Sequence, residues 1–318
     1  MSLFEGSITN VEGLSVGQVE NNIAKTGVTV VLCDENGATV AVDVRGAAPG
    51  TRETDLCKPE NTVEYANGVL LSGGSAFGLA AATGVMRFLE EKQVGVDMGC
   101  CHVPIVPAAV IFDLFCGDWK VRPDDEMGYQ ACTLANSTVK QGCYGAGSGA
   151  TVGKIIPSTT PAKGGVGTAS ITLSNGVTVG AIVVVNACGD IYHPHSGECI
   201  ACASAPNGEL VECEQFLLEN LNFDISKIDL KSGSNTTIGV IATDAKLTKA
   251  ESKRMATSAH DGLARTIRPV HTQMDGDTIF AMATGRKESK VNPIQLGTVA
   301  SEVMARAIAN AITAVKAQ

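Results

Sequence analysis

The sequence predicts a layered α/β fold in one domain of residues 1–318, and three observations support this. Strand-like and helical segments alternate along the chain, with no internal repeat. The hydrophobic fraction is 44% but aromatic residues make up only 4%, so the core must be built mainly from Val, Ile, Ala and Leu. The 35 glycines permit close packing of sheets and helices. The chain is longer than the usual domain of roughly 150 residues, yet layered folds of this size often form one domain.

The formal net charge is −9 at pH 7, and no basic cluster offsets it. Nucleic acid and anionic membrane surfaces are therefore poor partners. No apolar run reaches the ~18 residues that a membrane helix needs. The segment after Met1 lacks the charged and apolar regions of a signal peptide, and the 11 cysteines are an odd number. We therefore expect a soluble, cytoplasmic protein with reduced, mostly buried thiols.

The first clear strands are predicted at residues 26–33 and 38–44, where β-branched and apolar residues dominate. The sequence between them, Asp-Glu-Asn-Gly, contains Asn-Gly, which is a strong signal for a tight β-hairpin turn. We therefore expect the two strands to pair as a hairpin. The Gly and Pro content of residues 45–55 then predicts a loop of the kind that often carries binding groups.

A strand at residues 69–71 leads into a predicted helix of about five turns that ends at Lys92. Ser75 is the expected N-cap, because a serine hydroxyl can accept a hydrogen bond from the first helical turn. A serine at a strand-to-helix turn can also be a nucleophile on an elbow. Phe77, however, stands where the second glycine of the G-x-S-x-G motif would be, so the helix cap is the favoured interpretation.

A second hairpin is predicted between residues 169–173 and 177–185, where Ser-Asn-Gly supplies the turn. The end of its second strand is apolar throughout, as expected for a strand covered on both faces. Residues 203–235 are polar and irregular apart from a short helical signal.

In the last part of the chain, the sequence pattern predicts a strand, a helix, a second strand and a second helix, in that order. A strand at residues 237–243 precedes a helix opened by Thr248, and Glu251 three residues later fits a capping box. A strand at residues 278–283 and a final helix at residues 293–315 complete the predicted order.

A metal site is one interpretation of the segment that contains His193 and His195, followed by Cys199 and Cys202. Zinc accepts this ligand set. Structural zinc usually supports a small module with little core, whereas these cysteines lie in an apolar segment. Buried thiols beside two loop histidines are therefore favoured, and no metal or other cofactor is expected.

Another constellation centres on Thr236, which follows Asn235 where a small polar run meets an apolar strand. Asp275 and Asp277 lie two residues apart just before another strand, so both side chains would point the same way in extended backbone. Two such carboxylates usually face solvent or bind a cation. If they face a hydroxyl nucleophile, one can hold and polarise it while the other sets the protonation of a neighbouring amine.

Lys163 and Asn186 are polar residues at the edges of otherwise apolar or glycine-rich strands. An asparagine that ends a buried strand can donate an N–H to a developing oxyanion, and a desolvated lysine can support proton transfer. Each residue can equally have a satisfied structural role, and the pattern leaves both alternatives open.

Six long motifs occur in order along the chain: GVTVVLCDENGATVAVDVRGAAPGTRETDL, GVLLSGGSAFGLAAATGVMRFLEE, GAGSGATVGK, AKGGVGTAS, VVVNACGD and NTTIGVIATDAKLTKAE. Together they resemble the DmpA/BapA family of β-aminopeptidases, which includes the nylon-oligomer hydrolases, and the resemblance runs from about residue 11 to residue 315. The resemblance implies a four-layer αββα fold of the Ntn-hydrolase-like type. It also implies a precursor that cuts itself once, between Asn235 and Thr236. The resulting chains, 1–235 and 236–318, would stay associated and form a tetramer of cut protomers.

In that family the residue after the cut is the N-terminal Ser or Thr nucleophile of an amidase, so the resemblance makes Thr236 the nucleophile. A new α-amine has a reference pKa of about 8 and can act as the base for its own hydroxyl. Asp275 and Asp277 match the Asp-Gly-Asp of nylon-oligomer hydrolases, where the β-aminopeptidases have Ser-Gly-Glu. Asn186 matches the family's oxyanion asparagine.

Two further residues follow from the resemblance. Lys163 matches the lysine of the K-G-G-x-G motif, and Tyr129 is preferred to Tyr144 as the family's tyrosine near the nucleophile. The implied protein is an amide hydrolase that acts on small peptides or linear amide oligomers through an acyl-enzyme, without a cofactor. An acyltransferase of the ornithine acetyltransferase type, which shares the architecture, and an uncut, non-catalytic homologue are the alternatives.

Overall fold

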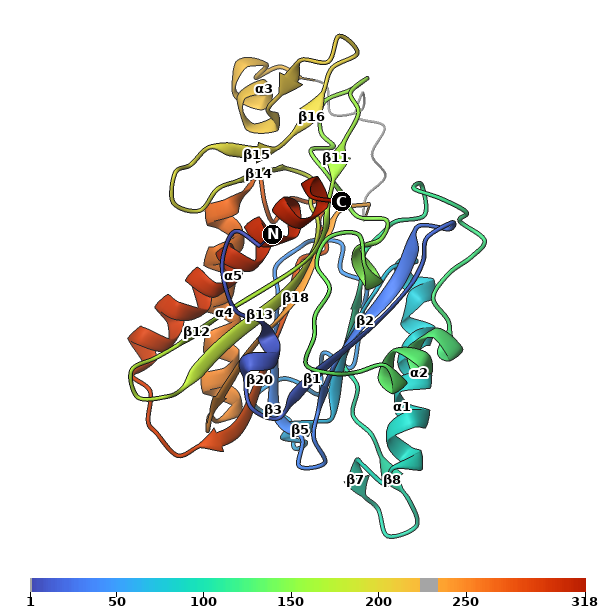
Figure 1. The fold of residues 1–318 in the computed structure, drawn as a ribbon, viewed down its shortest axis with the longest axis vertical. Helices are drawn as coiled ribbons and strands as arrows, with labels where there is room; N and C mark the ends of the chain where they lie inside the picture. The colour runs from blue at the N-terminus through green and yellow to red at the C-terminus, as the bar shows by residue number, and fades with distance from the viewer. Residues whose placement is uncertain (1, 224–233) are drawn as a thin grey trace.

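The computed structural model describes residues 2–223 and 234–318, and two stacked β-sheets form its centre (Figure 1). The first sheet has six strands in the order β12 (Gly165–Thr172), β13 (Thr178–Asn186), β18 (Thr236–Ala245), β20 (Thr278–Lys287), β3 (Ala38–Val44) and β5 (Tyr65–Ala66). The second has five in the order β1 (Leu14–Asn21), β2 (Thr26–Cys33), β6 (Gly68–Ser72), β9 (Ala108–Val110) and β4 (Thr51–Arg52).

Helices cover the outer face of each sheet (Figure 1). α4 (Lys249–Thr266) and α5 (Pro293–Lys316) lie on the six-stranded sheet, and their apolar side chains share one core cluster with its strands. α1 (Ala81–Glu91) and α2 (Asp125–Thr133) lie on the five-stranded sheet and share a second cluster with it. Both pairs of helices therefore bury an apolar face against a sheet.

The inner faces of the two sheets pack directly against each other. Their side chains form a third core cluster, to which the five-stranded sheet contributes Val31 and Leu71 and the six-stranded sheet contributes Ile182 and Phe280. The layers are thus helix, sheet, sheet and helix. The four-layer αββα fold that the resemblance implied is confirmed.

β18 lies in the interior of the six-stranded sheet, and every one of its ten residues is buried. It pairs antiparallel with β13, where Thr236 lies opposite Asn186, and parallel with β20, where Ile238 lies opposite Thr278. A β-branched, apolar strand suits such a position because both of its faces are covered. The packing therefore fixes the first residue of β18 at the end of a rigid strand.

Small elements extend the molecule beyond the stacked sheets, at the top of Figure 1. They include a three-stranded sheet of β15 (Cys199–Ala201), β14 (Asp190–Tyr192) and β19 (Ile267–Arg268), and the short helix α3 (Cys213–Glu219). The structure also describes three two-stranded pairs: β10 (Thr151–Val152) with β11 (Ala162–Lys163), β16 (Ala203–Ser204) with β17 (Leu210–Val211), and β7 (Val96–Asp97) with β8 (His102–Val103), the last at the bottom of Figure 1.

The strands predicted at residues 26–33 and 38–44 have the observed bounds of β2 and β3, but the predicted hairpin between them is wrong. The turn forms, because Gly37 has φ 69° and donates its N–H to the carbonyl oxygen of Asp34 at 2.9 Å. β2 nevertheless pairs with β1 and β6, and β3 pairs with β20 and β5. Turn chemistry specifies a reversal of the chain and not the sheet that the next strand joins, so this turn carries the chain from one sheet to the other.

The start predicted for the helix after residues 69–71 is also wrong. Gly74 is the residue before the helix, and Ser75–Ala80 form a 3₁₀ segment before the 11-residue α1. A Cβ on Gly78 would lie 1.9 Å from the carbonyl oxygen of Gly73, so the chain can wind this tightly only with glycine there. Ser75 itself has φ 55°, and its side chain caps no N–H of the described residues.

Other sequence predictions are confirmed. β12 and β13 form the predicted hairpin, with Thr172 opposite Thr178. The Thr248 and Glu251 side chains form the predicted capping box at the start of α4. α5 begins at Pro293, where the side chain of Asn292 accepts a hydrogen bond from a first-turn N–H.

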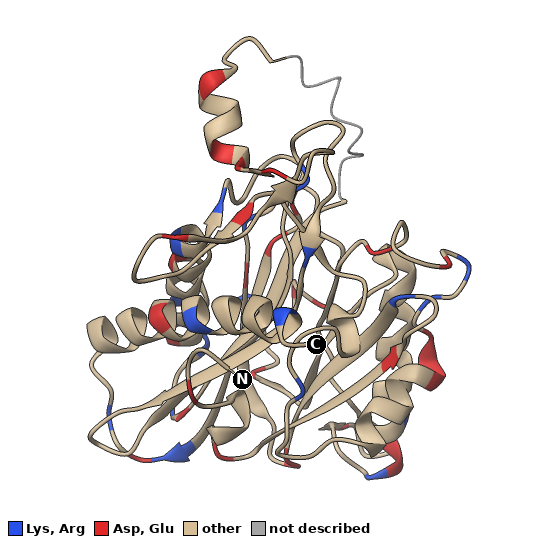
Figure 2. Cartoon of the chain, turned by 45° about the horizontal axis from the view of Figure 1, so that its top comes forward, with Lys and Arg blue, Asp and Glu red and all other residues tan. Residues whose placement is uncertain are grey.

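Lysines and arginines are scattered among acidic residues along the described chain and do not gather on one face (Figure 2). None of the helices within residues 2–223 and 234–318 has both the length and the apolar character that crossing a membrane requires.

Candidate active site

The Asn235–Thr236 peptide bond lies in a buried polar cluster at the start of β18. The exposed fractions of Asn235 and Thr236 are 0% and 3%. Gly276 donates its backbone N–H to the carbonyl oxygen of Asn235 at 2.9 Å, and the Thr236 hydroxyl donates to the same oxygen. Asn235 and Asp275 also form an isolated parallel bridge. Two donors on one carbonyl oxygen polarise that carbonyl toward nucleophilic attack.

Gly276 can approach the peptide bond closely because it has no side chain. A Cβ at this position would lie 2.7 Å from the carbonyl oxygen of Ala48 and 2.9 Å from Thr236 Oγ1. Ala48 in turn donates its N–H to the carbonyl oxygen of Asp275 at 2.9 Å, and Gly46 donates to that of Asp277 at 3.2 Å. The predicted loop after residue 44 therefore supports the Asp-Gly-Asp segment from outside.

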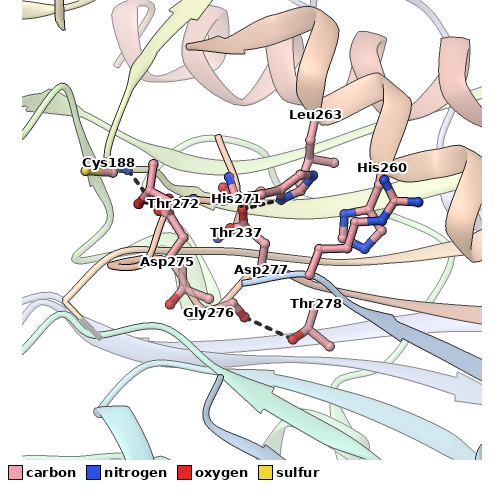
Figure 3. A network of polar contacts seen from close by, with 12 residues as sticks. Cys188, Thr237, His260, Leu263, His271, Thr272, Asp275, Gly276, Asp277 and Thr278 are labelled. Atoms are coloured by element: carbon pink, nitrogen blue, oxygen red, sulfur yellow. Dashed lines mark hydrogen bonds and ion pairs between the residues drawn. The ribbon is translucent and has the colours of Figure 1, made fainter. Parts of the chain in front are cut away.

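Asp277 connects the start of β18 to the loop before β20 (Figure 3). Its side chain is 1% exposed, and Oδ1 accepts the backbone N–H of Thr237 at 2.7 Å. Oδ2 accepts both the backbone N–H of His271 at 3.2 Å and its Nδ1–H at 2.8 Å. Asp277 thus holds the residue directly after Thr236.

Asp275 is held by a separate set of partners (Figure 3). Its Oδ2 accepts the backbone N–H of Thr272 at 2.9 Å and the Thr272 hydroxyl at 2.6 Å, and its Oδ1 faces the N–H of Cys188 at 3.4 Å. Burial, reinforced by the nearby charge of Asp277, raises the pKa of Asp275 to about 6. One carboxyl of the pair is therefore poised to exchange a proton near neutral pH.

Asn186, at the end of β13, lies opposite Thr236 in the sheet and is completely buried. Its Nδ2 donates to the carbonyl oxygens of Ser234 at 3.4 Å and Phe112 at 3.3 Å. Its Oδ1 accepts from the backbone N–H of Thr151 at 3.0 Å. One amide N–H of Asn186 therefore points at the backbone just before Asn235, and the other points at Phe112.

Lys154 is a site residue that the sequence analysis missed. Its ammonium group donates to the backbone oxygen and Oδ1 of Asn186, both at 3.0 Å, and to the carbonyl oxygen of Ser234 at 3.4 Å. Burial lowers the pKa of Lys154 to about 8. Its signal in the sequence was a lysine directly after the glycine-rich run of GAGSGATVGK.

Lys163 and Tyr129, the other predicted site residues, are not among the polar groups that contact the Asn235–Thr236 bond. Lys163 is exposed on the short strand β11, which pairs with β10 and with no other strand of the described residues. Tyr129 lies in the outer helical layer on α2, where its hydroxyl donates to Glu91 at 2.7 Å and its ring packs edge-on against Phe88. Both lysines border glycine-rich segments, and only the packing distinguishes the enclosed Lys154 from the exposed Lys163.

The two histidines considered as metal ligands, His193 and His195, make other contacts. His193 Nδ1 accepts backbone N–H groups of its own turn, at 3.2 Å from His195 and 3.0 Å from Ser196. His195 Nε2 pairs with Glu302 at 2.7 Å. Within the described ranges, no group of three His, Cys, Asp or Glu side chains is arranged to hold a metal ion.

A model of peptidase family S58 matches residues 6–317 of the chain. An uncharacterized aminopeptidase from Mycobacterium bovis is 48% identical over 294 residues, which cover 88% of this chain and 81% of the relative. A 6-aminohexanoate-oligomer endohydrolase from Kocuria sp. is 31% identical over 315 residues, which cover 94% of this chain and 84% of the relative.

Two solved structures share the fold. A β-aminopeptidase from Burkholderia sp. superposes with a TM-score of 0.68 at 22% identity and covers 97% of this chain and 86% of its own. An L-aminopeptidase D-Ala-esterase/amidase from Ochrobactrum anthropi, described as a variant of the Ntn hydrolase fold, superposes with a TM-score of 0.69 at 20% identity. The match covers 99% of this chain and 88% of the latter.

Proposed function

The chain belongs to peptidase family S58, and from that premise we propose that it cuts itself between Asn235 and Thr236 to become an N-terminal-threonine amide hydrolase. Family membership makes the chain a hydrolase of peptide or amide bonds. The observation that supports self-cleavage at this bond is that the carbonyl oxygen of Asn235 accepts hydrogen bonds from the Gly276 N–H and the Thr236 hydroxyl. The nucleophile, the target carbonyl and a fixed backbone donor thus lie together before any cut.

The first step of self-cleavage uses groups that lie in this cluster. The Thr236 hydroxyl oxygen bonds to the carbonyl carbon of Asn235 while its proton passes to the Thr236 nitrogen, and the Gly276 N–H stabilises the charge that develops on the carbonyl oxygen. The C–N bond then breaks, the protonated Thr236 nitrogen leaves as an amine, and an ester joins Asn235 to Thr236 Oγ1. Water hydrolyses the ester and leaves a carboxylate on Asn235 and a free amine on Thr236.

Turnover reuses the same arrangement. The free amine of Thr236 has a reference pKa of about 8, so it can take the proton of its own hydroxyl near neutral pH. The substrate carbonyl would occupy the position of the Asn235 carbonyl, beside the Gly276 N–H. Asn186 Nδ2 and the Lys154 ammonium, which bind the Ser234 carbonyl in the uncut chain, could then donate to the acyl part of the substrate.

The two products should stay associated because they share one sheet. β18 and β20 belong to residues 236–318, whereas their neighbours β13 and β3 belong to residues 1–235. The hydrogen-bonded ladders on both sides cross the cut, and α4 and α5 pack on strands of both products. Cleavage therefore removes one covalent bond from a layer that packing continues to hold.

The proposed substrates are small peptides and linear amides. One relative at 48% identity is named an aminopeptidase, and one at 31% identity is named an endohydrolase of 6-aminohexanoate oligomers. The Asp-Gly-Asp sequence at residues 275–277 favours linear amides of the second kind. A panel of amino-acid p-nitroanilides, β-dipeptides and 6-aminohexanoate oligomers separates these classes, and acetyl transfer to ornithine without amide hydrolysis would support the acyltransferase alternative instead.

Fragment analysis of matched variants tests the cut itself. The 32.7 kDa wild-type chain should yield a fragment of about 8 kDa that holds 83 of the 318 residues and begins at Thr236. Thr236→Ser keeps a hydroxyl and should be cut, whereas Thr236→Val keeps the shape of the side chain without the hydroxyl and should stay whole and inactive. Thr237→Val is the control, because the buried Thr237 hydroxyl has no hydrogen-bond partner among the described residues. A cut or active Thr236→Val protein would refute the proposal.

A further inference from the structure

His271 lies next to the proposed machinery without a role in the chemistry above. It belongs to the loop between β19 and β20, six residues before Asp277, and its side chain is 18% exposed. Its backbone N–H and its Nδ1 both contact Asp277 Oδ2, at 3.2 Å and 2.8 Å. Since a carboxylate is an acceptor, Nδ1 carries the hydrogen in this contact. His271 is thus a two-point clamp on one oxygen of the carboxylate.

The other oxygen of the same carboxylate holds the nucleophile's strand. Asp277 Oδ1 accepts the N–H of Thr237 at 2.7 Å, and Thr237 follows Thr236 directly. A carboxylate fixed at Oδ2 cannot rotate without losing the His271 contacts. The orientation of His271 is therefore transmitted through Asp277 to the backbone that carries Thr236.

The buried imidazole of His260 packs against the imidazole of His271. The His260 and His271 ring centroids are 4.8 Å apart in an edge-to-face arrangement (Figure 3). His260, on α4, is 0% exposed, and its Nε2 lies 2.9 Å from the carbonyl oxygen of Asp43, so Nε2 carries the hydrogen. Burial lowers the pKa of His260 to about 4, so this ring is neutral at pH 7 and packs against His271 without a charge.

The backbone at His271 is held in an uncommon conformation. Its φ is 55°, in the left-handed region that non-glycine residues rarely adopt, and Asn is among the residues that adopt it most easily. The same conformation makes the double contact possible, because the N–H and the side chain of one residue reach the same carboxylate oxygen. A strained residue beside a proposed active site calls for a functional explanation.

We propose that His271 is a positioning residue that, through its Nδ1–H bond to Asp277, keeps this carboxylate aimed at the N–H after Thr236. This inference rests on the proposed function, because it concerns the rate at which Thr236 acts. The titratable groups around Asp277 are His271 and Asp275 on its own loop, His260 on α4 and the Cys188 thiol on the connection after β13. Of these, His271 is the group that donates a hydrogen bond to the carboxylate.

Two amide substitutions distinguish the effect of the Nδ1–H donor of His271 from the effect of the size of its ring. His271→Asn places an N–H near the position of Nδ1, whereas His271→Gln is a similar amide whose N–H lies near the position of Nε2. The chain already accepts Gln in this backbone conformation, since Gln93 has φ 58° on the surface. His271→Gly, which also fits the conformation, removes the side chain altogether, and Gln93→Asn is the control for substitution in a left-handed residue.

The experiment follows self-cleavage after pulse-labelled cell-free synthesis, with kcat and KM on the best p-nitroanilide of the panel. His271→Asn should cut within about threefold of the wild-type rate, and His271→Gln and His271→Gly should be roughly 10- to 100-fold slower with KM nearly unchanged, as expected when a hydrogen bond to a charged group is lost. Thermal unfolding checks that each variant folds.

Equal rates in all His271 variants would overturn the positioning role. So would an Asn variant that folds and cuts as slowly as the Gln variant, because the donor would then be irrelevant. If the Gly variant does not fold, the Asn and Gln comparison still decides. Failure of the proposed function has a different signature, namely a Thr236→Val chain that is still cut, whatever the His271 variants do.

Discussion

Gly276→Ala is the sharpest perturbation of the candidate site, because it adds one methyl group where the structure has no room. Gly276 does not adopt a positive φ, so alanine is compatible with its backbone conformation. The new Cβ would lie 2.7 Å from the Ala48 carbonyl oxygen, 2.9 Å from Thr236 Oγ1 and 3.1 Å from Pro49 Cα. Two of these neighbours are backbone atoms of a loop that cannot rotate aside. The Asp-Gly-Asp segment must therefore shift away from the loop or from Thr236.

The expected loss of rate follows from the hydrogen bond that such a shift weakens. The Gly276 N–H is 2.9 Å from the Asn235 carbonyl oxygen, and moving it by a few tenths of an ångström weakens this bond. Removal of one oxyanion donor from an acyl-transfer site costs about 2.7–4 kcal/mol, or 10²–10³ in rate. We expect self-cleavage of Gly276→Ala to slow by that factor, with the fold retained.

The assay is the time course of the fragment of about 8 kDa after cell-free synthesis, with the melting temperature of the uncut chain measured in parallel. Gly297→Ala is the matched control. Its Cβ would also meet an atom at 2.9 Å, but this atom is Ser258 Oγ, which can rotate away. Gly297 lies within α5, so alanine there should keep the cutting rate and stabilise the helix by up to about 1 kcal/mol. Wild-type cutting by a folded Gly276→Ala chain would refute the role of the Gly276 N–H.

Three further predictions follow from the site. Burial raises the pKa of Asp275 from 3.8 to about 6, so its contribution to stability is present below pH 4 and is lost as the pH rises to about 6. In the uncut Thr236→Val background, Asp275→Asn should therefore make the melting temperature, measured by calorimetry, less dependent on pH across this window. An unchanged pH dependence would contradict the raised pKa. Lys154→Met should slow both self-cleavage and kcat by roughly 10²-fold, the scale of a lost proton-transfer group, and wild-type kinetics would remove Lys154 from the site. Lys163→Ala and Tyr129→Phe should cut at the wild-type rate, with stability changes of about 0.5–1 kcal/mol in chemical denaturation; a block in either would restore that residue to the site.

Much of the fold could be predicted because its signals are local. The β-branched and apolar residues of β2 and β3, the capping box of Thr248 and the apolar run of β13 are patterns of residues within a few positions of one another. These patterns act through backbone dihedrals and the spacing of side chains along one element. The resemblance then added the Asn235–Thr236 junction and the Asp-Gly-Asp segment, whose proximity agrees with the 2.9 Å contact between Gly276 and Asn235.

The sequence therefore predicted several of the main strands and helices, such as those at residues 26–33, 38–44 and 293–315, and the residue types that a hydrolase of this family uses. The sheet that each strand joins, the lysine that is enclosed and the histidine that holds Asp277 became apparent only in the folded structure. The physical reason is that Lys154 and Lys163 look alike in their own segments, and desolvation distinguishes them only after β13 and the residues before β18 surround one of them. His271 likewise has its proposed role only because the fold of its loop places the Asp277 carboxylate within hydrogen-bond distance of its side chain.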